Sequence, residues 1–225
     1  RYKFNKKLNI AYRLPGCISA ADVFDPETGE ILVAKEEKIT EETAKRIQNA
    51  GINVVEVLVS DEKAGRIAHR VIGNNTVDFS ALSDKNPKSF GLLPTVYYPN
   101  FAFSKELAAA CDNAPEEQVA EQYLARINAA YFTEETKPSD DEKAEERKSR
   151  ERRREDRIRF VHACRVFHEL LNREEVSVSA EERKEIRPLV EKLNHRHITV
   201  DDVVAAISTN LDLRYGIGTI DNIDH

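Results

Sequence analysis

A continuous stretch of 32 residues, 141–172, most strongly limits what this chain can fold into. Opposite charges recur four residues apart in its first half, a spacing that places both side chains on one face of an α-helix. The pairs are Glu146–Arg150, Arg147–Glu151, Arg152–Asp156 and Glu155–Arg159. The second half adds an apolar stripe of Ile158, Val161, Cys164, Phe167 and Leu171. The spacing predicts a helix roughly 48 Å long, with its first half in solvent and its second half against a core.

Residues 15–82 follow a different pattern, which is typical of a small mixed module. The turn Asp25-Pro26-Glu27-Thr28-Gly29 separates one apolar run, which includes Ile18 and Val23, from a second at Ile31–Val33. Its proline presets one backbone angle and its glycine accepts a positive φ. We therefore expect a β-hairpin here.

A short helix and further strands are expected after that hairpin. Thr40 can cap the helix, and Gly51 stands where a left-handed residue would end it. The alternating apolar residues of 52–59 predict a strand. The runs Arg66–Ile72 and Thr76–Phe79, joined by Gly73-Asn74-Asn75, suggest a second hairpin.

The remaining residues combine a connector with helices. The prolines of 83–100 indicate a loop or extended connector. Helices are expected over Glu116–Ala130 and over Ile198–Leu213, where Thr199 and Asp202 can cap the start. The predicted fold class is α+β, with a small β-rich hairpin–helix–strand module and a helical region that contains one long charged helix.

Composition narrows the functional class. The net charge of −6 and pI near 5.6 argue against an autonomous nucleic-acid binder, which would need a basic surplus for phosphate contacts. Three widely spaced cysteines without a CxxC pair argue against a zinc ribbon or a disulfide framework, and reduced thiols suit a cytosolic protein. There is no membrane-spanning apolar run. A chain that starts at Arg1 and lacks methionine is expected to be an internal fragment, unless methionines are missing from the sequence.

Two segments near the chain ends carry a family resemblance. The tail 215–225, YGIGTIDNIDH, resembles the segment of bacterial RNA polymerase β subunits that reads nearly G-x-G-x-x-D-D-I-D-H before L-G-N-R-R. Asn222 departs from that pattern, because a second acidic residue is usual there. Arg1–Leu8 is similar to the family's G-R-x-K-x-N-x-x-L. In compact members these stretches lie close in sequence, so the resemblance implies that residues 9–195 are a lineage-specific insertion in the lobe, with ends that meet in space.

A third match lies inside that insertion. Residues 21–32, ADVFDPETGEIL, followed by Asn49-Ala50-Gly51-Ile52, resemble the β–β′ module of the large polymerase subunits. Residues 91–99 resemble insertion sequence of some Gram-positive relatives, and 100–195 match no pattern. The implied domains are a lobe scaffold strand at 1–14, the module at 15–82, a connector and helical part at 83–195, and a returning lobe helix and tail at 196–225.

The resemblance also implies a function. Bacterial RNA polymerase transfers nucleotidyl groups to an RNA 3′ end with Mg²⁺, whose ligands lie in another subunit, so this fragment alone is expected to be inactive and without a cofactor. The implied partners are the β′, α, ω and σ subunits and, through the whole complex, DNA, in the bacterial cytoplasm at the nucleoid. The insertion is expected to be a protein-interaction or structural appendage. The alternatives are a stand-alone regulatory protein-binding module and an insertion that contacts downstream DNA.

The resemblance assigns one nucleic-acid-binding position. Asp224, with Ile223 beside it, matches the aspartate that meets a flipped non-template guanine at the downstream edge of the melted bubble. A carboxylate can accept both donors of guanine's Watson–Crick edge. From the residues alone, Asp221 and Asp224 are better explained as residues that cap a turn.

Four other groups of side chains could suggest a nucleic-acid, metal or catalytic site, but each has a simpler structural explanation. The basic residues Arg1, Lys3, Lys6 and Lys7 indicate a solvated segment, and residues 140–159, with nine basic and eight acidic side chains, indicate a salt-bridged exposed helix. Cys164 is expected in a core, and His168, His195 and His197 on the surface, rather than as zinc ligands. The carboxylates of Asp25, Glu27 and Glu30 are expected to shape a turn. No metal or catalytic residue is predicted.

Overall fold

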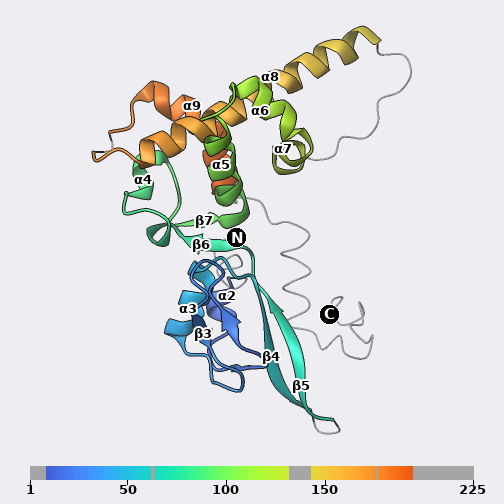
Figure 1. Cartoon of the computed structure of the whole chain (residues 1–225), viewed down its shortest axis with the longest axis vertical. Coiled ribbons are helices and arrows are strands. Elements are labelled where there is room, and N and C mark those ends of the chain that lie inside the picture. The colour runs from blue at the N-terminus through green and yellow to red at the C-terminus, as the bar shows by residue number, and fades with distance from the viewer. Residues whose placement is uncertain (1–8, 62–63, 132–142, 176, 195–225) are drawn as a thin grey trace, which may run out of the picture. The chain divides into compact units, whose positions relative to one another are not determined.

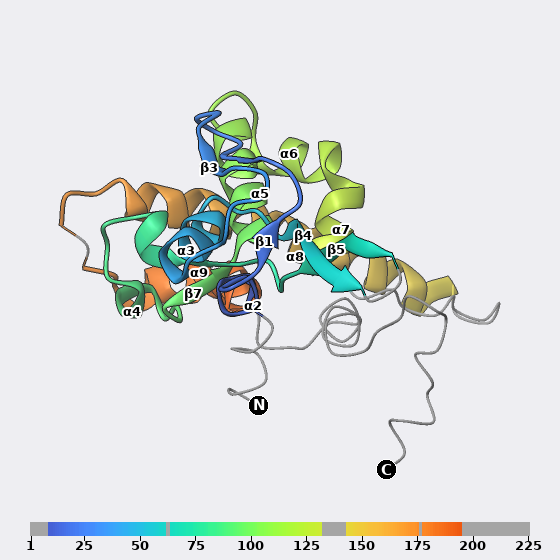
Figure 2. The same ribbon diagram turned by 90° about the horizontal axis from the view of Figure 1, so that it is seen from below.

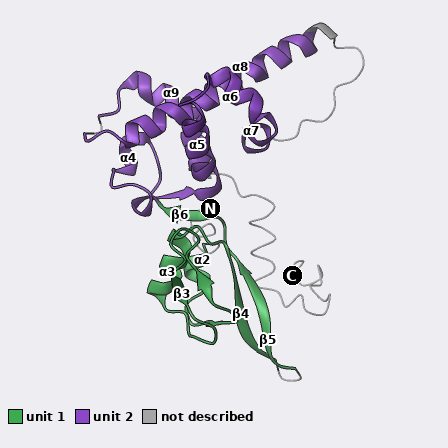
Figure 3. Cartoon of the chain, in the orientation of Figure 1, with its two compact units in different colours: residues 1–78, 197–225 green, residues 79–196 purple. Residues whose placement is uncertain are grey.

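The computed structural model describes residues 9–61, 64–131, 143–175 and 177–194 (Figure 1). These residues form two compact units, which divide between Asp78 and Phe79 (Figure 3). The expected boundary lay slightly later, between residues 82 and 83. Phe79 begins the second unit because its side chain is fully buried in that unit's core, beside Phe90.

The first unit is built on a three-stranded antiparallel sheet. Its order is β1 (Ile18–Ser19), β4 (Val54–Asp61) and β5 (Gly65–Ile72). The register of β4 and β5 runs without a break from Val54 opposite Ile72 to Asp61 opposite Gly65. The predicted hairpin of Arg66–Ile72 with Thr76–Phe79 is therefore wrong, because β5 pairs with β4 instead. The inward residues Val55 and Val57 of β4 lie on the buried face of this sheet.

The β2–β3 hairpin confirms the turn predicted from residues 25–29. Strands β2 (Val23–Phe24) and β3 (Ile31–Val33) pair with Phe24 opposite Ile31. The Oδ1 atom of Asp25 accepts hydrogen bonds from the amides of Glu27 and Thr28, at 2.8 and 3.1 Å. Gly29 has φ +74°, the left-handed conformation that its position required.

Helix α3 (Glu41–Asn49) packs against this sheet and forms the core of the unit. The Oγ1 atom of Thr40 accepts a hydrogen bond from the amide of Thr43 at 3.1 Å, and Gly51 follows the helix with φ +74°, so both predicted ends are confirmed. The core takes inward residues from the helix and from the strands: Leu32, Val33, Ile39, Ala44, Ile47, Val55, Val57 and Val71.

The residues before the module also belong to its core. Over Ile10–Arg13 the expected lobe strand is instead a helical turn, α2, because Asn9 caps it by accepting from the amide of Ala11 at 3.0 Å. Ile10 and Leu14 are buried in the same core. Residues 1–8 and 195–225 lie outside the described residues. The expected proximity of the two chain ends therefore stays a prediction. The unit ends with β6 (Thr76–Asp78).

The second unit is mainly helical (Figures 1 and 2). Its elements are η1 (Phe79–Ala81), α4 (Pro87–Phe90), β7 (Thr95–Tyr97), α5 (Tyr98–Ala110), α6 (Glu116–Gln122), α7 (Leu124–Tyr131), α8 (Lys143–Leu171) and α9 (Ala180–Leu193). The expected connector at 83–100 is thus folded, with Phe90, Leu92 and Val96 buried. The predicted helix Glu116–Ala130 is broken at Tyr123, which leaves the helical conformation.

Helix α8 organises this unit. Its second half packs against the core as predicted: Val161, Cys164 and Phe167 of the predicted stripe are inaccessible to solvent, as is Phe160, whereas Ile158 and Leu171 are half-buried. Helix α9, which the sequence analysis did not predict, packs along α8 and starts at a capping box of Ser179 and Glu182. None of the described helices is long and apolar enough to cross a membrane. The observed combination of helices and small antiparallel sheets is the predicted α+β class.

Candidate functional site

The positions with the most specific sequence-based assignment, Ile223 and Asp224, lie outside the described residues. The basic residues of 1–7 and the predicted helix Ile198–Leu213 lie outside them as well. Within the described residues, chemically capable side chains gather in three places of the second unit. These are a partly buried serine–histidine pair, a charged cluster between helices, and an arginine-rich part of α8.

The serine–histidine pair is part of the core. Nε2 of His168 lies 2.8 Å from Oγ of Ser104, a residue without solvent exposure. The ring of His168 contacts those of Phe101 and Phe167, with centroids 5.4 and 5.3 Å apart. Burial lowers the pKa of His168 to about 4, with a smaller contribution from Lys105, so the ring is neutral at physiological pH.

Cys164 and His168 do not form a metal site. The predicted core position of Cys164 is confirmed, and burial raises the pKa of its thiol well above the usual value. His168, predicted at the surface, is half-buried, because the rings of Phe101 of α5 and Phe167 of α8 pack against it. His195 and His197 lie outside the described residues. Among the residues that are described, no group of three or more His, Cys, Asp or Glu side chains could hold a metal ion.

The charged cluster connects α6 with α8. Oε1 of Glu116 accepts from Nε of Arg165 at 2.7 Å and lies 2.9 Å from Nδ1 of His162, while Arg165 also donates to Glu169 at 2.7 Å. Burial opposes ionisation of Glu116, but the hydrogen bonds from Arg165 and His162 outweigh it, so its pKa lies below the usual value. Every member is satisfied by another member, as in a structural ion-pair network. The sequence analysis missed it, because the partners are 46 and 49 residues apart.

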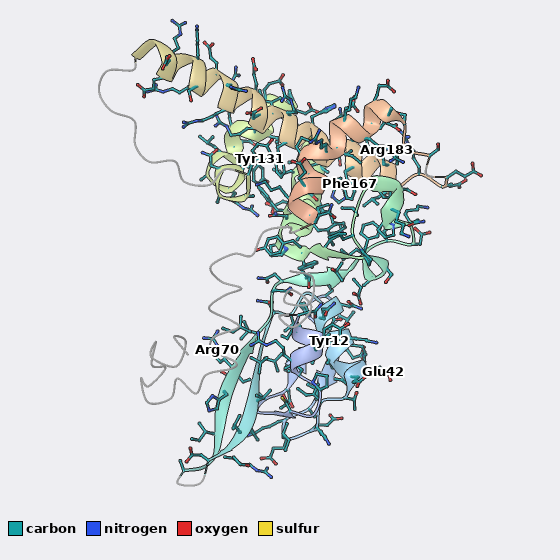
Figure 4. All side chains as sticks on the ribbon, turned by 180° about the vertical axis from the view of Figure 1, so that it is seen from behind. Tyr12, Glu42, Arg70, Tyr131, Phe167 and Arg183 are labelled. Carbon is teal, nitrogen blue, oxygen red and sulfur yellow. The ribbon has the colours of Figure 1, made fainter. Side chains whose placement is uncertain are left out.

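The arginine-rich part of α8 extends away from the helical core. The start of α8 runs beyond α6 and α7 (Figures 1 and 2), and its side chains spread into solvent (Figure 4). Two of the predicted ion pairs are present, Glu146–Arg150 at 2.5 Å and Arg147–Glu151 at 3.7 Å. In addition, Arg159 pairs with Asp156 and Arg154 pairs with Glu121 of α6. This part of α8 is a strongly charged, accessible surface of the second unit.

Among the carboxylates predicted to shape the turn of the β2–β3 hairpin, Asp25 does so directly. Asp25 accepts the two amide hydrogen bonds of its turn, and Glu30 pairs with Arg46 of α3 at 2.8 Å. The side chains of Glu30 and Arg46 are both about half exposed or more. No two of these acids are brought together for acid–base chemistry, since each is committed to the fold or to solvent.

Curated proteins named DNA-directed RNA polymerase subunit beta are similar to the whole chain. The identity is 33% over 225 residues with Clostridioides difficile (strain 630), 32% over 226 residues with Clostridium kluyveri (strain NBRC 12016), and 31% over 225 residues with Clostridium perfringens (strain 13 / Type A). Each alignment covers 100% of this chain and 12% of the relative. No family model matches the chain. The alignments include residues 100–195, for which sequence motifs indicated no relative.

Proposed function

We propose that this chain, whose curated homologues along its whole length are β subunits of DNA-directed RNA polymerase, functions as one segment of such a subunit in DNA-templated transcription. The observation that carries the proposal is the alignment of all 225 residues with the β subunit of Clostridioides difficile at 33% identity. The chain spans about 12% of the length of the curated relatives that it matches. The reaction of the complete enzyme, nucleotidyl transfer to RNA, is therefore proposed for the assembled complex.

The segment is proposed to have no catalytic step of its own. Nucleotidyl transfer by the complete enzyme uses Mg²⁺, and we assign no step of that reaction to the described residues. We propose that another subunit holds that metal and that this segment by itself is inactive. Its proposed partners are the β′, α, ω and σ subunits and, within the complex, DNA. This function implies the bacterial cytoplasm at the nucleoid.

The two compact units support a structural role in the subunit. Each has its own apolar core, one around Ile39 and Ile47 and the other around Phe160 and Phe167. Partly buried ion pairs such as Glu116–Arg165 connect the helices of the second unit. We propose that these units are an appendage of the polymerase lobe that stabilises it or contacts other proteins.

A segment exchange tests the proposal. The aligned segment of the Clostridioides difficile β subunit is replaced by this chain, and the purified polymerase is assayed for promoter-dependent RNA synthesis. A parallel exchange with the aligned segment of Clostridium kluyveri, which is 32% identical to this chain, controls for the effect of replacing the segment. We expect both hybrids to assemble and transcribe. If only the Clostridium kluyveri hybrid is active, this chain is not an equivalent segment and the proposal fails.

Asp224 is proposed, with Ile223, to contact an unpaired guanine in the assembled polymerase. The support is chemical, since a carboxylate accepts from both N–H donors of guanine while an amide oxygen and amino group cannot. In the hybrid enzyme, Asp224→Asn should weaken promoter complexes with guanine at the downstream bubble edge by roughly tenfold, in the range of a lost bidentate base contact. Complexes with adenine at that position should change little, and equal losses for both bases would contradict the assignment.

A further inference from the structure

The first half of α8 contains a short run of concentrated positive charge. Residues 147–154, RKSRERRR, hold six basic side chains and one acidic side chain, a net charge of +5 in a chain whose net charge is −6. The balanced count over residues 140–159 conceals this, because the acidic residues gather at either end of that stretch. We refer to residues 147–154 of α8 as the basic arm.

The basic arm is accessible along its length. All of its residues except Ser149 are exposed, and the side chains of Arg147, Arg150 and Arg154 retain 84%, 74% and 57% of their accessible surface. Ion pairs between such exposed groups contribute little and exchange readily for another anion. The ion pairs of Arg147 with Glu151 and of Arg154 with Glu121 are also long, at 3.7 and 3.6 Å.

Lys148 and Arg152 are the basic side chains most available to a ligand. They stand four residues apart, so they lie on one face of α8, about 6 Å apart along the axis. Within the described residues neither has an ion pair.

The composition of the arm discriminates between two kinds of partner. A protein interface needs a desolvated core, usually with aromatic or aliphatic anchors. The basic arm has no apolar residue, so it cannot supply such a core. Binding to a nucleic-acid backbone needs only charge and hydrogen-bond donors, and five of the six basic residues are arginines, whose planar guanidinium matches a phosphate with two hydrogen bonds.

We infer that the basic arm binds the phosphate backbone of nucleic acid, with Lys148 and Arg152 as its central contacts and without base specificity. The identification of the polyanion as nucleic acid rests on the proposed function, whereas the charge pattern stands by itself. The arm would thus add a sequence-independent contact to a segment whose remaining charge is strongly negative.

Fluorescence anisotropy with the full 225-residue chain tests this inference. The probes are a labelled duplex DNA of roughly 20 base pairs and a single-stranded RNA of the same length, titrated at several NaCl concentrations from about 25 mM upward. The test variant is Lys148→Gln with Arg152→Gln, which removes both charges but keeps residues that favour helices. The matched control is Arg183→Gln with Lys184→Gln, an exposed pair on α9 of the same unit (Figure 4).

We expect the test variant to bind roughly tenfold more weakly at low salt and its salt slope to fall by about 2, one for each lost phosphate contact. The control variant should bind like the unchanged chain, and circular dichroism should show equal helix content in all three. Preference for one probe would identify DNA or RNA as the source of the phosphates.

Three results would overturn the inference. These are no binding at about 25 mM salt, equal losses in both variants, and tight binding of poly-L-glutamate where neither nucleic acid binds. The last result would indicate an acidic protein partner. Each leaves the segment-exchange experiment unaffected, so failure here and failure of the proposed function can be told apart.

Discussion

Nε2 of His168 lies 2.8 Å from Oγ of Ser104, and the hydroxyl of Ser104 already donates its hydrogen to the carbonyl of Phe101 at 2.7 Å. A hydroxyl has one hydrogen, so Nε2 of His168 must be the donor to Oγ. The neutral ring therefore carries its proton on Nε2, and an added proton would have to go to Nδ1. The aromatic rings packed around His168 give that second proton no compensating partner among the described contacts.

His168 should make the protein less stable in mild acid. Its pKa is about 4 in the folded protein, because of burial and then Lys105, against 6.5 for an ordinary histidine. Between these values the unfolded chain binds more protons, so the free energy of unfolding rises with pH there and is fully regained above 6.5. The effect can reach about 3 kcal/mol. Urea unfolding from about pH 7 to about pH 4.5 should show it, with a flatter dependence in His168→Gln.

Glu116→Gln should destabilise the second unit by roughly 1 kcal/mol. The substitution removes the negative charge that Arg165 and His162 share and leaves Glu169 as the carboxylate that pairs with Arg165 among the described contacts. Glu117→Gln is the matched control, because Glu117 is the exposed neighbour on the same turn of α6. Thermal unfolding of the two variants should separate them, and equal midpoints would show that the cluster contributes nothing measurable.

Gly73→Ala should destabilise the first unit by about 1–3 kcal/mol through overpacking. A Cβ atom at this position would lie 2.8 Å from Cβ of Ile10 and 2.7 Å from Oδ1 of Asn53, which accepts from the amide of Asn75. Gly29→Ala tests backbone strain without a clash, since Gly29 has φ +74° and open space around it. Urea unfolding should rank Gly73→Ala as the more damaging substitution, and the reverse order would contradict the close approach.

The three cysteines should react with iodoacetamide at very different rates. Cys164 is fully buried and burial raises its thiol pKa well above the ordinary value, whereas Cys17 and Cys111 are partly exposed with more modestly raised pKa values. Since the thiolate is the reacting form, Cys17 and Cys111 should be alkylated slowly at neutral pH and faster as pH rises. Cys164 should react only after unfolding. Peptide mass spectrometry checks the order, and early modification of Cys164 would refute its core position.

Local patterns predicted the elements whose cause lies within a few residues. Thr40 caps α3, Gly29 and Gly51 adopt the left-handed conformation, and the apolar stripe of α8 is buried where its spacing placed it. Each of these depends on interactions between near neighbours in the chain, so sequence spacing carries the information. The capping box of Ser179 and Glu182 is a signal of the same kind that the sequence analysis overlooked.

Candidate site residues were predictable only where the resemblance supplied them. Asp224 and Ile223 came from a family motif and remain predictions. The basic arm was visible in the sequence as RKSRERRR, but its charge was averaged with acidic residues beyond its ends. The basic arm is accessible because α8 extends past its neighbouring helices (Figure 1). The spacing of charged residues predicted solvent exposure for the whole first half of this helix.

By itself, the sequence determined the α+β class, the β2–β3 turn, the ends of α3 and the two-part character of α8, because periodicity and capping act over one or two turns. Only the tertiary structure decided that β5 pairs with β4, that Phe79 opens the second unit, and that Glu116 meets Arg165. Strand pairing, burial and ion-pair partners depend on which distant surfaces exclude water from each other, and many such pairings are compatible with one local pattern. The packing of the whole core determines which of these pairings forms.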